Sequence, residues 1–370
     1  MSTVRATNFQ HASATNPAIV LAADGSATAN VSSINNGPLA GMRNAIINGN
    51  FDHWQRGTSF TGNEYGADRW VSARTGTTHT ATRQAFTLGQ TDVTGEPAYY
   101  HQTVVSSVAG ASNRSVLAQP LEDVRTFAGQ QVTISFWAKA DATKNIAVDL
   151  AQIFGSGGSP SATVDAIGVT KVSIGTSWQK IIITANVPSI GGKTLGTDNN
   201  HSVNLNIWFD AGSDYNSRTD SLGQQSGTFD IAQVQVEPGP VATPFEHRPI
   251  GTELELCQRY YFRMQPGGSD RAYGLGFART NTVNHCVIPF PVAMRGNVSA
   301  VETTGTATDY GVDQDNGGLK TCSSAPNFLR GGYLNATINF GIAAGTTTGG
   351  EAVIATARNS NSFLGFSAEL

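Results

Sequence analysis

The stretch Val132-Thr-Ile-Ser-Phe-Trp-Ala-Lys-Ala140 decides the fold class, because apolar and polar side chains alternate along it. A period of two is typical of a β-strand with one face on a core and the other face away from it. The stretch Val203-Asn-Leu-Asn-Ile-Trp-Phe-Asp210 repeats the pattern. Both stretches gather apolar residues on one face and place a tryptophan among polar groups on the other. We therefore expect half-buried strands of the kind that build a sandwich.

The composition around these stretches is that of an all-β protein. The chain has 370 residues, 41 of them glycine, and 14% are charged, against about 25% in a typical globular chain. Ser, Thr and Asn compete with helical backbone bonds, and Gly costs about 1 kcal/mol per helical position. Further strand-like runs are Tyr99–Ser106, Asn145–Phe154, Trp178–Val187 and Thr228–Glu237. Many short strands with Gly-rich turns predict a jelly-roll β-sandwich.

The pattern divides the chain into four segments. We expect an extended N-terminal arm at 1–40, the jelly roll at 41–247, a short helical linker at 248–265 and a smaller C-terminal β-sandwich at 266–370. The first segment has short apolar runs among small polar residues, so it has no core of its own. We expect this arm to pair with sister chains or with a docking protein.

The linker is predicted to hold one short helix. Thr252 and Glu255 have the spacing of a capping box, in which Thr252 is the N-cap. Ile250, Leu254, Cys257 and Tyr261 lie at helical spacing and form an apolar stripe. This stripe packs either on the chain's own sandwich or at a three-fold axis between copies.

Charge, hydropathy and cysteine usage exclude several classes of partner. The formal net charge is −4 and no basic patch occurs, so we expect no nucleic-acid binding. Apolar runs are far shorter than the roughly 20 residues that span a bilayer, so we expect no membrane insertion. Residues 1–20 lack a signal-peptide pattern. Cys257, Cys286 and Cys322 are scattered and odd in number, which predicts buried, reduced thiols in a protein made in the cytosol.

The polar faces of the alternating strands supply candidate ligand-binding residues. Sugars present apolar C–H faces and hydroxyl edges, which suit tryptophan beside Asn and Asp. The candidate glycan-binding residues are Trp137, Trp208, Asn204, Asn206 and Asp149. The alternative is that these tryptophans are buried against loops, a neighbouring chain or the C-terminal domain.

Two Gly/Thr/Ser/Asn-rich segments, 303–328 and 341–350, form a second candidate region, because binding residues concentrate on loops held by a rigid scaffold. The candidate contacts there are Tyr310, Asp313, Asp315 and Asn316.

Other aromatic and charged residues are interpreted as structural. Trp178 is assigned to core or edge packing. Arg56 and Arg69 lie close in sequence to Asp52 and Asp68, and we expect these four residues to form an ion-pair cluster.

Several motifs, in order along the chain, resemble a module common in phage tail-fibre proteins. They are Asn44-Ala-Ile-Ile-Asn-Gly-Asn-Phe-Asp-His-Trp-Gln-Arg-Gly57, Tyr65-Gly-Ala-Asp-Arg-Trp70, Thr228-Phe-Asp-Ile-Ala-Gln-Val-Gln-Val-Glu-Pro-Gly239, Glu253-Leu-Glu-Leu-Cys-Gln-Arg-Tyr-Tyr-Phe262 and Ser367-Ala-Glu-Leu370. The resemblance implies a virion fibre or receptor-binding subunit, usually a homotrimer, that attaches to other virion proteins through its N-terminal arm. Such a protein is made in the host cytoplasm and located in the virion.

The same module resembles carbohydrate-binding jelly rolls of the family 4/9 type. The matching segments are Asn48-Gly-Asn-Phe-Asp52, Ser135-Phe-Trp-Ala-Lys-Ala140 and Ile231-Ala-Gln-Val234. In the family, carboxylates of the third segment help to hold a structural calcium, and here they are replaced by Ala232 and Gln233. Asp52 and Asp230 remain as candidate calcium ligands.

Taken together, the sequence predicts a non-catalytic fibre subunit that binds host-surface polysaccharide. A glycosidase needs paired carboxylates, and no recognisable acid/base pair or nucleophile motif occurs, so we expect no catalytic residues. The alternatives are a structural virion connector, shaft or head-fibre protein without sugar binding, and an enzyme that cuts polysaccharide.

Overall fold

The computed structural model describes residues 8–9, 19–21, 23, 27–29, 41–314, 318–343 and 350–370. They fall into two compact units, which are described separately: the first ends at Arg248, and the second holds 249–370 together with the short stretches 53–57 and 67–69. A small antiparallel sheet in the first unit comprises β1 (Asn8–Phe9), β2 (Ile19–Leu21) and β3 (Ala27–Ala29). Apart from these strands and Ala23, the expected arm at 1–40 lies outside the described residues.

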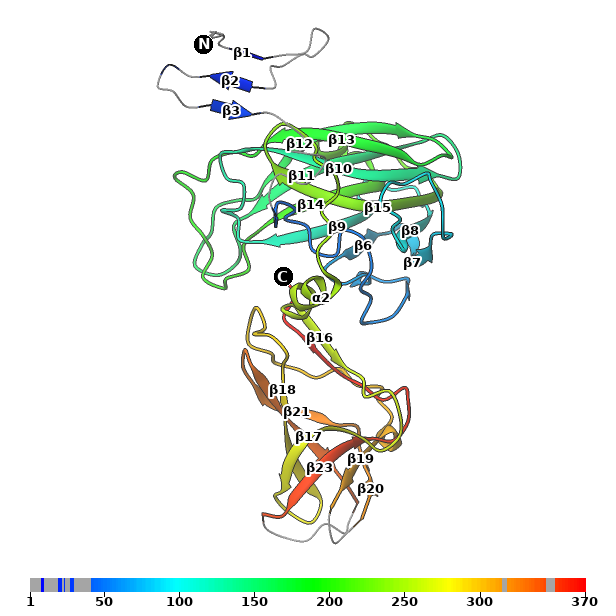
Figure 1. Cartoon of the computed structure of the whole chain (residues 1–370), viewed down its shortest axis with the longest axis vertical. Coiled ribbons are helices and arrows are strands. Elements are labelled where there is room, and N and C mark those ends of the chain that lie inside the picture. The colour runs from blue at the N-terminus through cyan, green and yellow to red at the C-terminus, as the bar shows by residue number, and fades with distance from the viewer. Residues whose placement is uncertain are drawn as a thin grey trace, which may run out of the picture. The chain divides into compact units, whose positions relative to one another are not determined.

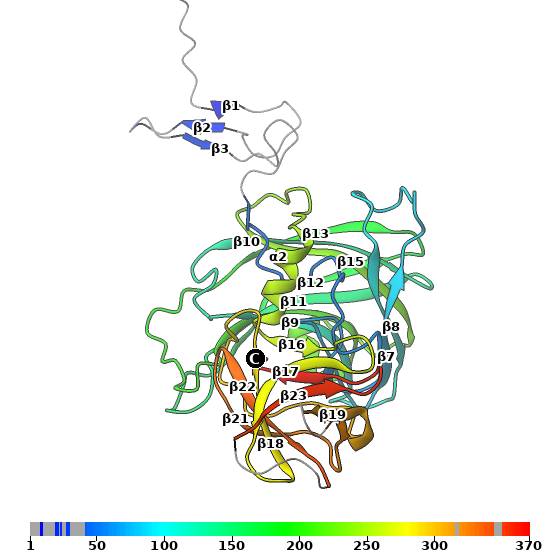
Figure 2. The same cartoon turned by 60° about the horizontal axis from the view of Figure 1, so that its bottom comes forward.

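The rest of the first unit is a sandwich of two antiparallel sheets stacked face to face (Figures 1 and 2). Sheet I comprises, in order, β13 (Gln179–Asn186), β10 (Gln131–Ala140), β15 (Gly227–Pro238), β8 (Tyr99–Ser106), β7 (Thr78–Ala85) and β4 (Ser59–Phe60). Sheet II comprises β12 (Val164–Ile174), β11 (Lys144–Ile153), β14 (Ser202–Ala211), β9 (Arg114–Glu122), β6 (Val71–Thr75) and β5 (Glu64–Tyr65).

The alternation along β10 and β14 sets the inner faces of the sandwich. The inward side chains of β10 are Val132, Ile134, Phe136 and Ala138, and those of β14 are Val203, Leu205, Ile207 and Phe209; all are at most 1% exposed. Phe209 of sheet II stacks on Phe229 of sheet I with ring centroids 5.0 Å apart. Burying a side chain of this size stabilises the fold by about 1.5–3 kcal/mol, so these rows hold the two sheets together.

The second unit contains a seven-stranded antiparallel sheet and a two-stranded one. The larger sheet comprises, in order, β20 (Lys320–Thr321), β19 (Tyr310–Asp313), β23 (Ala352–Ala357), β17 (Arg271–Ala278), β18 (Val283–Pro289), β22 (Asn335–Gly341) and β21 (Asn327–Gly331). The smaller one pairs β16 (Tyr261–Met264) with β24 (Leu364–Ser367). A 3₁₀ turn, η2, spans Ala307–Asp309. The chain is therefore mostly β, as the sequence predicted.

The linker helix begins earlier than the sequence predicted. Helix α2 spans Ile250–Gln258, and its N-cap is Pro249, which makes no side-chain capping bond. The expected cap, Thr252, thus lies inside the helix. Proline is favoured where a helix begins because its fixed φ suits the first turn. Of the expected apolar stripe Cys257 is buried, whereas Ile250 is 63% exposed. Tyr261 lies beyond the helix and begins β16.

All three cysteines are buried, as predicted. Burial raises the pKa of Cys286 and of Cys322 to about 12. These thiols stay protonated at neutral pH and react slowly, since the thiolate is the reactive form. Among the described residues, no helix has both the length and the apolar character needed to cross a bilayer.

Candidate functional site

The polar face of β14 is covered, which corrects one part of the predicted glycan platform. Trp208 is 1% exposed, Asn206 7% and Asp149, on the neighbouring β11, 0%. The indole Nε1 of Trp208 donates to Asp149 Oδ1 at 2.8 Å. Asn204 is half-buried and accepts a hydrogen bond from Ser202 Oγ at 2.7 Å. Trp208, Asn206 and Asp149 are therefore structural and do not form an open platform.

The cover comes from the chain that follows β14. It forms a 3₁₀ turn, η1 (Ser213–Tyr215), and a short helix, α1 (Asn216–Thr219), that packs on β11, β12 and β14. Arg218 of α1 binds Asp149 with Nε–Oδ2 and Nη2–Oδ1 distances of 2.9 and 3.3 Å. The Arg218 guanidinium lies 4.9 Å from the Trp208 ring, and Tyr215 packs on the same indole. The indole and the carboxylate are thus enclosed in a satisfied network.

Trp137 belongs to the other sheet and does not meet these residues. It lies on β10 of sheet I and is half-buried. Since the two sheets turn their inner faces to a common core, the outer faces that carry Trp137 and Trp208 point in opposite directions. The structure brings together Trp208 and Asp149 from the predicted set and separates them from Trp137.

The outer face of sheet I carries a row of polar side chains beside Trp137. Lys139 of β10 lies opposite Asp230 of β15, which lies opposite Gln102 of β8. Lys139 Nζ is 3.5 Å from Asp230 Oδ2, and Gln102 Nε2 donates to Asp230 Oδ1 at 2.9 Å. On the other side of the row, Trp178 immediately precedes β13, next to the partner of Ala138. This row places an ammonium, a carboxylate and an amide side by side on three neighbouring strands.

Three aromatic rings gather against this row. The centroid of Phe86 lies 4.9 Å from that of Tyr100 and 5.3 Å from that of Trp178. Tyr100 and Trp178 meet edge to face at 5.3 Å. All three side chains are half-buried, and Lys139 Nζ lies 5.1 Å from the Trp178 ring. The rings are thus fixed by one another and by a cation–π contact, and each keeps part of its surface accessible.

We call this surface the aromatic face; it comprises Phe86, Tyr100, Trp137, Lys139, Trp178 and Asp230. Burial raises the pKa of Asp230, although the Gln102 hydrogen bond and the Lys139 charge act in the opposite direction. Burial, and then the charge of Asp230, raise the pKa of Tyr100, so its hydroxyl stays protonated and can donate. The face can therefore stack on the apolar face of a ligand ring and form hydrogen bonds with polar groups at the edge of that ring.

Of the residues of the aromatic face, the sequence analysis named only Trp137 as ligand-binding and assigned Asp230 to calcium. It missed Phe86, Tyr100, Lys139 and Trp178. Phe86 follows the last residue of β7, and Trp178 precedes the first residue of β13, so neither lies within an alternating strand. The one sequence signal for this face was Lys139 on the polar side of β10, because a lysine side chain at that position needs partners on the neighbouring strands. Only the cross-strand register shows that Trp178 and Asp230 flank it.

The candidate calcium ligands do not fit a calcium site. The Asp230 carboxylate is engaged by Lys139 and Gln102, and Asp52 Oδ2 accepts from Asn50 Nδ2 at 2.9 Å. Within the described residues, no group of three or more His, Cys, Asp and Glu side chains is arranged to hold a metal ion. Calcium needs about six to eight oxygen ligands, and an ammonium beside the carboxylate opposes it.

In the second candidate region, one of the four expected contacts is corrected. Tyr310 lies on β19, is fully buried and donates its hydroxyl to the Phe363 carbonyl at 2.8 Å, so it is a core residue. Asp313 ends the same strand and lines a hollow of about 590 Å³ with Leu275 and Ile354. The remaining two residues, Asp315 and Asn316, lie outside the described residues.

The arginines of the expected ion-pair cluster have a partner that the sequence analysis did not name. Arg56 and Arg69 both pair with Glu369, Arg56 at 3.3 Å. Asp68 accepts from the backbone and side-chain nitrogens of Gln55 at 2.9 and 2.7 Å, and the charge of Arg56 also acts on it. The Glu369 carboxylate, distant in sequence, reaches these arginines within the second unit.

Comparisons with known proteins give distant structural matches. No protein-family model and no curated protein sequence matches the chain. The enzymatically active domain of tailspike protein 4 from bacteriophage CBA120 matches with 15% identity and a TM-score of 0.32, over 56% of this chain and 24% of that one. This match therefore spans about a quarter of the tailspike chain.

Carbohydrate-binding modules match over about half of this chain. A family 4 module has 18% identity and a TM-score of 0.29, over 52% of this chain and 99% of the module. A family 11 module from Clostridium thermocellum, solved with a β-1,3-1,4-mixed-linked tetrasaccharide, has 13% identity and a TM-score of 0.30, over 51% and 98%. The chain is thus similar, at a distance, to a phage tailspike domain and to carbohydrate-binding modules, and inferences about its function rest on its own side chains.

Proposed function

We propose that the chain is a non-catalytic fibre subunit of a phage virion that attaches to host-surface polysaccharide through the aromatic face. The observation that carries the proposal is the cluster of Phe86, Tyr100 and Trp178, with centroids 4.9–5.3 Å apart, on an outer sheet face. The virion location and the trimeric state are supported by the sequence resemblance to tail-fibre modules.

The aromatic face suits a sugar chain for two physical reasons. Aromatic rings bury the apolar C–H face of a pyranose, while Asp230, Lys139 and Gln102 offer acceptors and donors to its hydroxyls. The rings and the ion pair also hold one another in place before a ligand arrives. Binding then costs little side-chain entropy, which favours affinity.

The charged groups of this face favour binding over hydrolysis. A glycosidase needs one carboxylic acid free to protonate the leaving group and a second carboxylate about 5–10 Å away. Asp230 is paired with Lys139, and Asp141, whose charge acts on Asp230, accepts a hydrogen bond from the Thr228 amide at 3.0 Å. Both carboxylates therefore act as partners of a cation or an amide, and protonating either one would weaken that interaction.

A glycan array probed with the full-length chain tests the proposal. We expect binding to surface polysaccharides of the host, with a loss of at least tenfold in affinity for Tyr100→Ala. Tyr333→Ala removes a 52% exposed tyrosine from the second unit and serves as the matched control. Retained binding by Tyr100→Ala would move the site elsewhere, release of reducing ends would show an enzyme, and no binding to any glycan would favour a structural connector.

A further inference from the structure

The second unit holds a hollow with a different chemistry from the aromatic face. It has a volume of about 360 Å³ and is lined by Phe277, Arg279, His285, Leu329 and Arg330. Phe277 and Arg279 come from the end of β17 and the turn after it, His285 from β18, and the other two from β21. This volume lies in the range of small-molecule sites.

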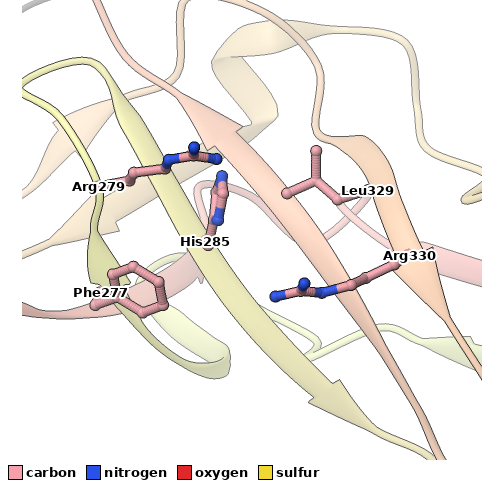
Figure 3. A pocket seen from close by; sticks show the side chains of 5 residues that line it. All are labelled: Phe277, Arg279, His285, Leu329 and Arg330. Atoms are coloured by element: carbon pink, nitrogen blue, oxygen red, sulfur yellow. The ribbon is translucent and has the colours of Figure 1, made fainter.

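Positive charge converges on this hollow. Figure 3 shows Arg279 and Arg330 reaching toward His285 from opposite sides. In the part of the chain that the structure describes, neither guanidinium has an ion-pair or hydrogen-bond partner, and no carboxylate lines the hollow. Burial, followed by the charges of Arg279 and Arg330, lowers the pKa of His285. At neutral pH the positive charge is therefore that of two guanidinium groups around a buried neutral imidazole.

Apolar surface forms the rest of the wall. Phe277 is 46% exposed and Leu329 41% exposed. Leu329 lies in the β-bulge between Phe328 and Arg330, which turns two successive side chains of β21 toward the hollow. The Phe277 ring meets His285 edge-on at 5.8 Å, so its position is fixed by a buried residue. One apolar ring face thus lies beside two free guanidinium donors.

We propose that this hollow binds an anionic sugar unit. A carboxylate or phosphate substituent would lie between Arg279 and Arg330, whose planar forks bind such oxyanions bidentately. The C–H face of the sugar ring would lie against Phe277 and Leu329. The site is separate from the aromatic face, since all its residues belong to the second unit, and the two sites stand or fall independently.

Titration of the full-length chain with matched ligands tests this site. D-galacturonate and galactose differ in one carboxylate, glucose 6-phosphate supplies the phosphate substituent, and inorganic phosphate supplies an oxyanion without a ring. We expect binding of galacturonate or glucose 6-phosphate, at least tenfold weaker binding of galactose, and a loss of at least tenfold in the double variant Arg279→Gln/Arg330→Gln. The stronger of the two anionic sugars identifies the substituent.

Three controls keep the result interpretable. Arg271→Gln changes an exposed arginine at the far end of β17 and should leave binding unchanged. Arg279→Lys/Arg330→Lys keeps the charge and should give an intermediate loss, because an ammonium lacks the bidentate fork. Phe277→Ala should weaken the anionic sugar more than inorganic phosphate.

Three outcomes would overturn the proposal. They are binding of galactose as tight as that of the stronger anionic sugar, binding of inorganic phosphate without either anionic sugar, and unchanged affinity in a folded Arg279→Gln/Arg330→Gln variant. A change in oligomeric mass in that variant, with no anion binding by the unmodified chain, would instead assign the surface to self-association.

Discussion

At the scale of single residues, Asp149 shows how a polar face becomes part of the interior. Its carboxylate is fully buried and bonded by Trp208 and Arg218. A buried ion pair contributes little net stability when intact, but removing one partner leaves an uncompensated charge. Asp149 and Trp208 on this face of β11 and β14 are therefore buried and bonded to other side chains of the chain, and they are not exposed to a ligand.

Replacing Arg218 tests that view. We expect Arg218→Met to lower the free energy of unfolding of the first unit by about 3 kcal/mol, because Asp149 loses its cationic partner in a buried site. Chemical denaturation monitored by tryptophan fluorescence measures the loss. Arg125→Met is the matched control, since Arg125 and its partner Asp123 are 59% and 41% exposed, and a pair of this kind contributes about 0–1 kcal/mol. Equal losses in both variants would contradict the burial argument.

His101 predicts a pH dependence of stability. Burial, followed by the charge of His79, lowers the pKa of His101 from 6.5 to about 3. The unfolded chain binds this proton below pH 6.5 whereas the folded chain does not, so stability falls as the pH drops below 6.5. We expect this histidine to contribute a loss of about 3 kcal/mol between pH 7 and pH 4. For His101→Gln, the free energy of unfolding measured by denaturant titration should depend less steeply on pH across this range. An unchanged pH dependence would count against the assignment to His101.

At the scale of elements, the sequence identified strands whose two faces differ. The alternation along β10 and β14 located both strands, and it also separated core residues from outward ones. β9 was missed because seven of its nine residues are buried, so the alternation that marks a half-buried strand is absent. β12 was missed because its register shifts twice against β11 and Gly168 interrupts it.

The sequence predicted the residue types of the candidate site, an aromatic ring beside polar groups, but not its location. Alternation shows which side chains point away from the core, but it does not show what covers them. The cover over Trp208 comes from η1 and α1, a connection with no periodicity of its own. The aromatic face depends on Phe86 and Trp178, which lie at strand ends and meet only through the sheet register. Contacts between sequence-distant loops and sheet faces are tertiary information.

A prediction at this scale concerns β12. Gly168 has φ +65°, and a Cβ there would lie 2.3 Å from the Ala185 Cβ of β13. An added methyl group combines overpacking with an unfavourable left-handed backbone. We expect Gly168→Ala to destabilise the first unit by about 3 kcal/mol. Gly175→Ala, in the connection between β12 and β13 and with open space around it, should change stability by less than about 1 kcal/mol. Thermal unfolding midpoints of the two variants measure this difference. Similar midpoints would contradict the close contact between Gly168 and Ala185.

At the scale of the whole molecule, the two units offer two different binding chemistries. The aromatic face of the first unit offers stacking rings with a neutralised ion pair, whereas the hollow of the second unit offers two guanidinium groups that have no ion-pair partner among the described residues. Salt should therefore affect the two differently, because screening weakens attraction to an ion more than ring stacking. We therefore expect neutral sugar units at the aromatic face and acidic units at the hollow.

The proposed fibre role predicts a homotrimer. Three copies would multiply weak sugar contacts, since linked sites raise the effective concentration of each further contact. Light scattering of the full-length chain at micromolar concentration should give three times the mass of one chain. A monomeric mass would contradict the trimer and leave the N-terminal strands without the sister chains proposed to pair with them.

The central claim is that glycan binds the outer face of sheet I and not that of sheet II. The most direct test measures the affinity of the full-length chain for purified host-surface polysaccharide, with Trp178→Ala and Trp208→Phe compared under conditions where both are folded. The account predicts a loss of at least tenfold, about 1.4 kcal/mol, for Trp178→Ala and unchanged affinity for Trp208→Phe. The reverse result, with binding lost only when Trp208 changes, would contradict it.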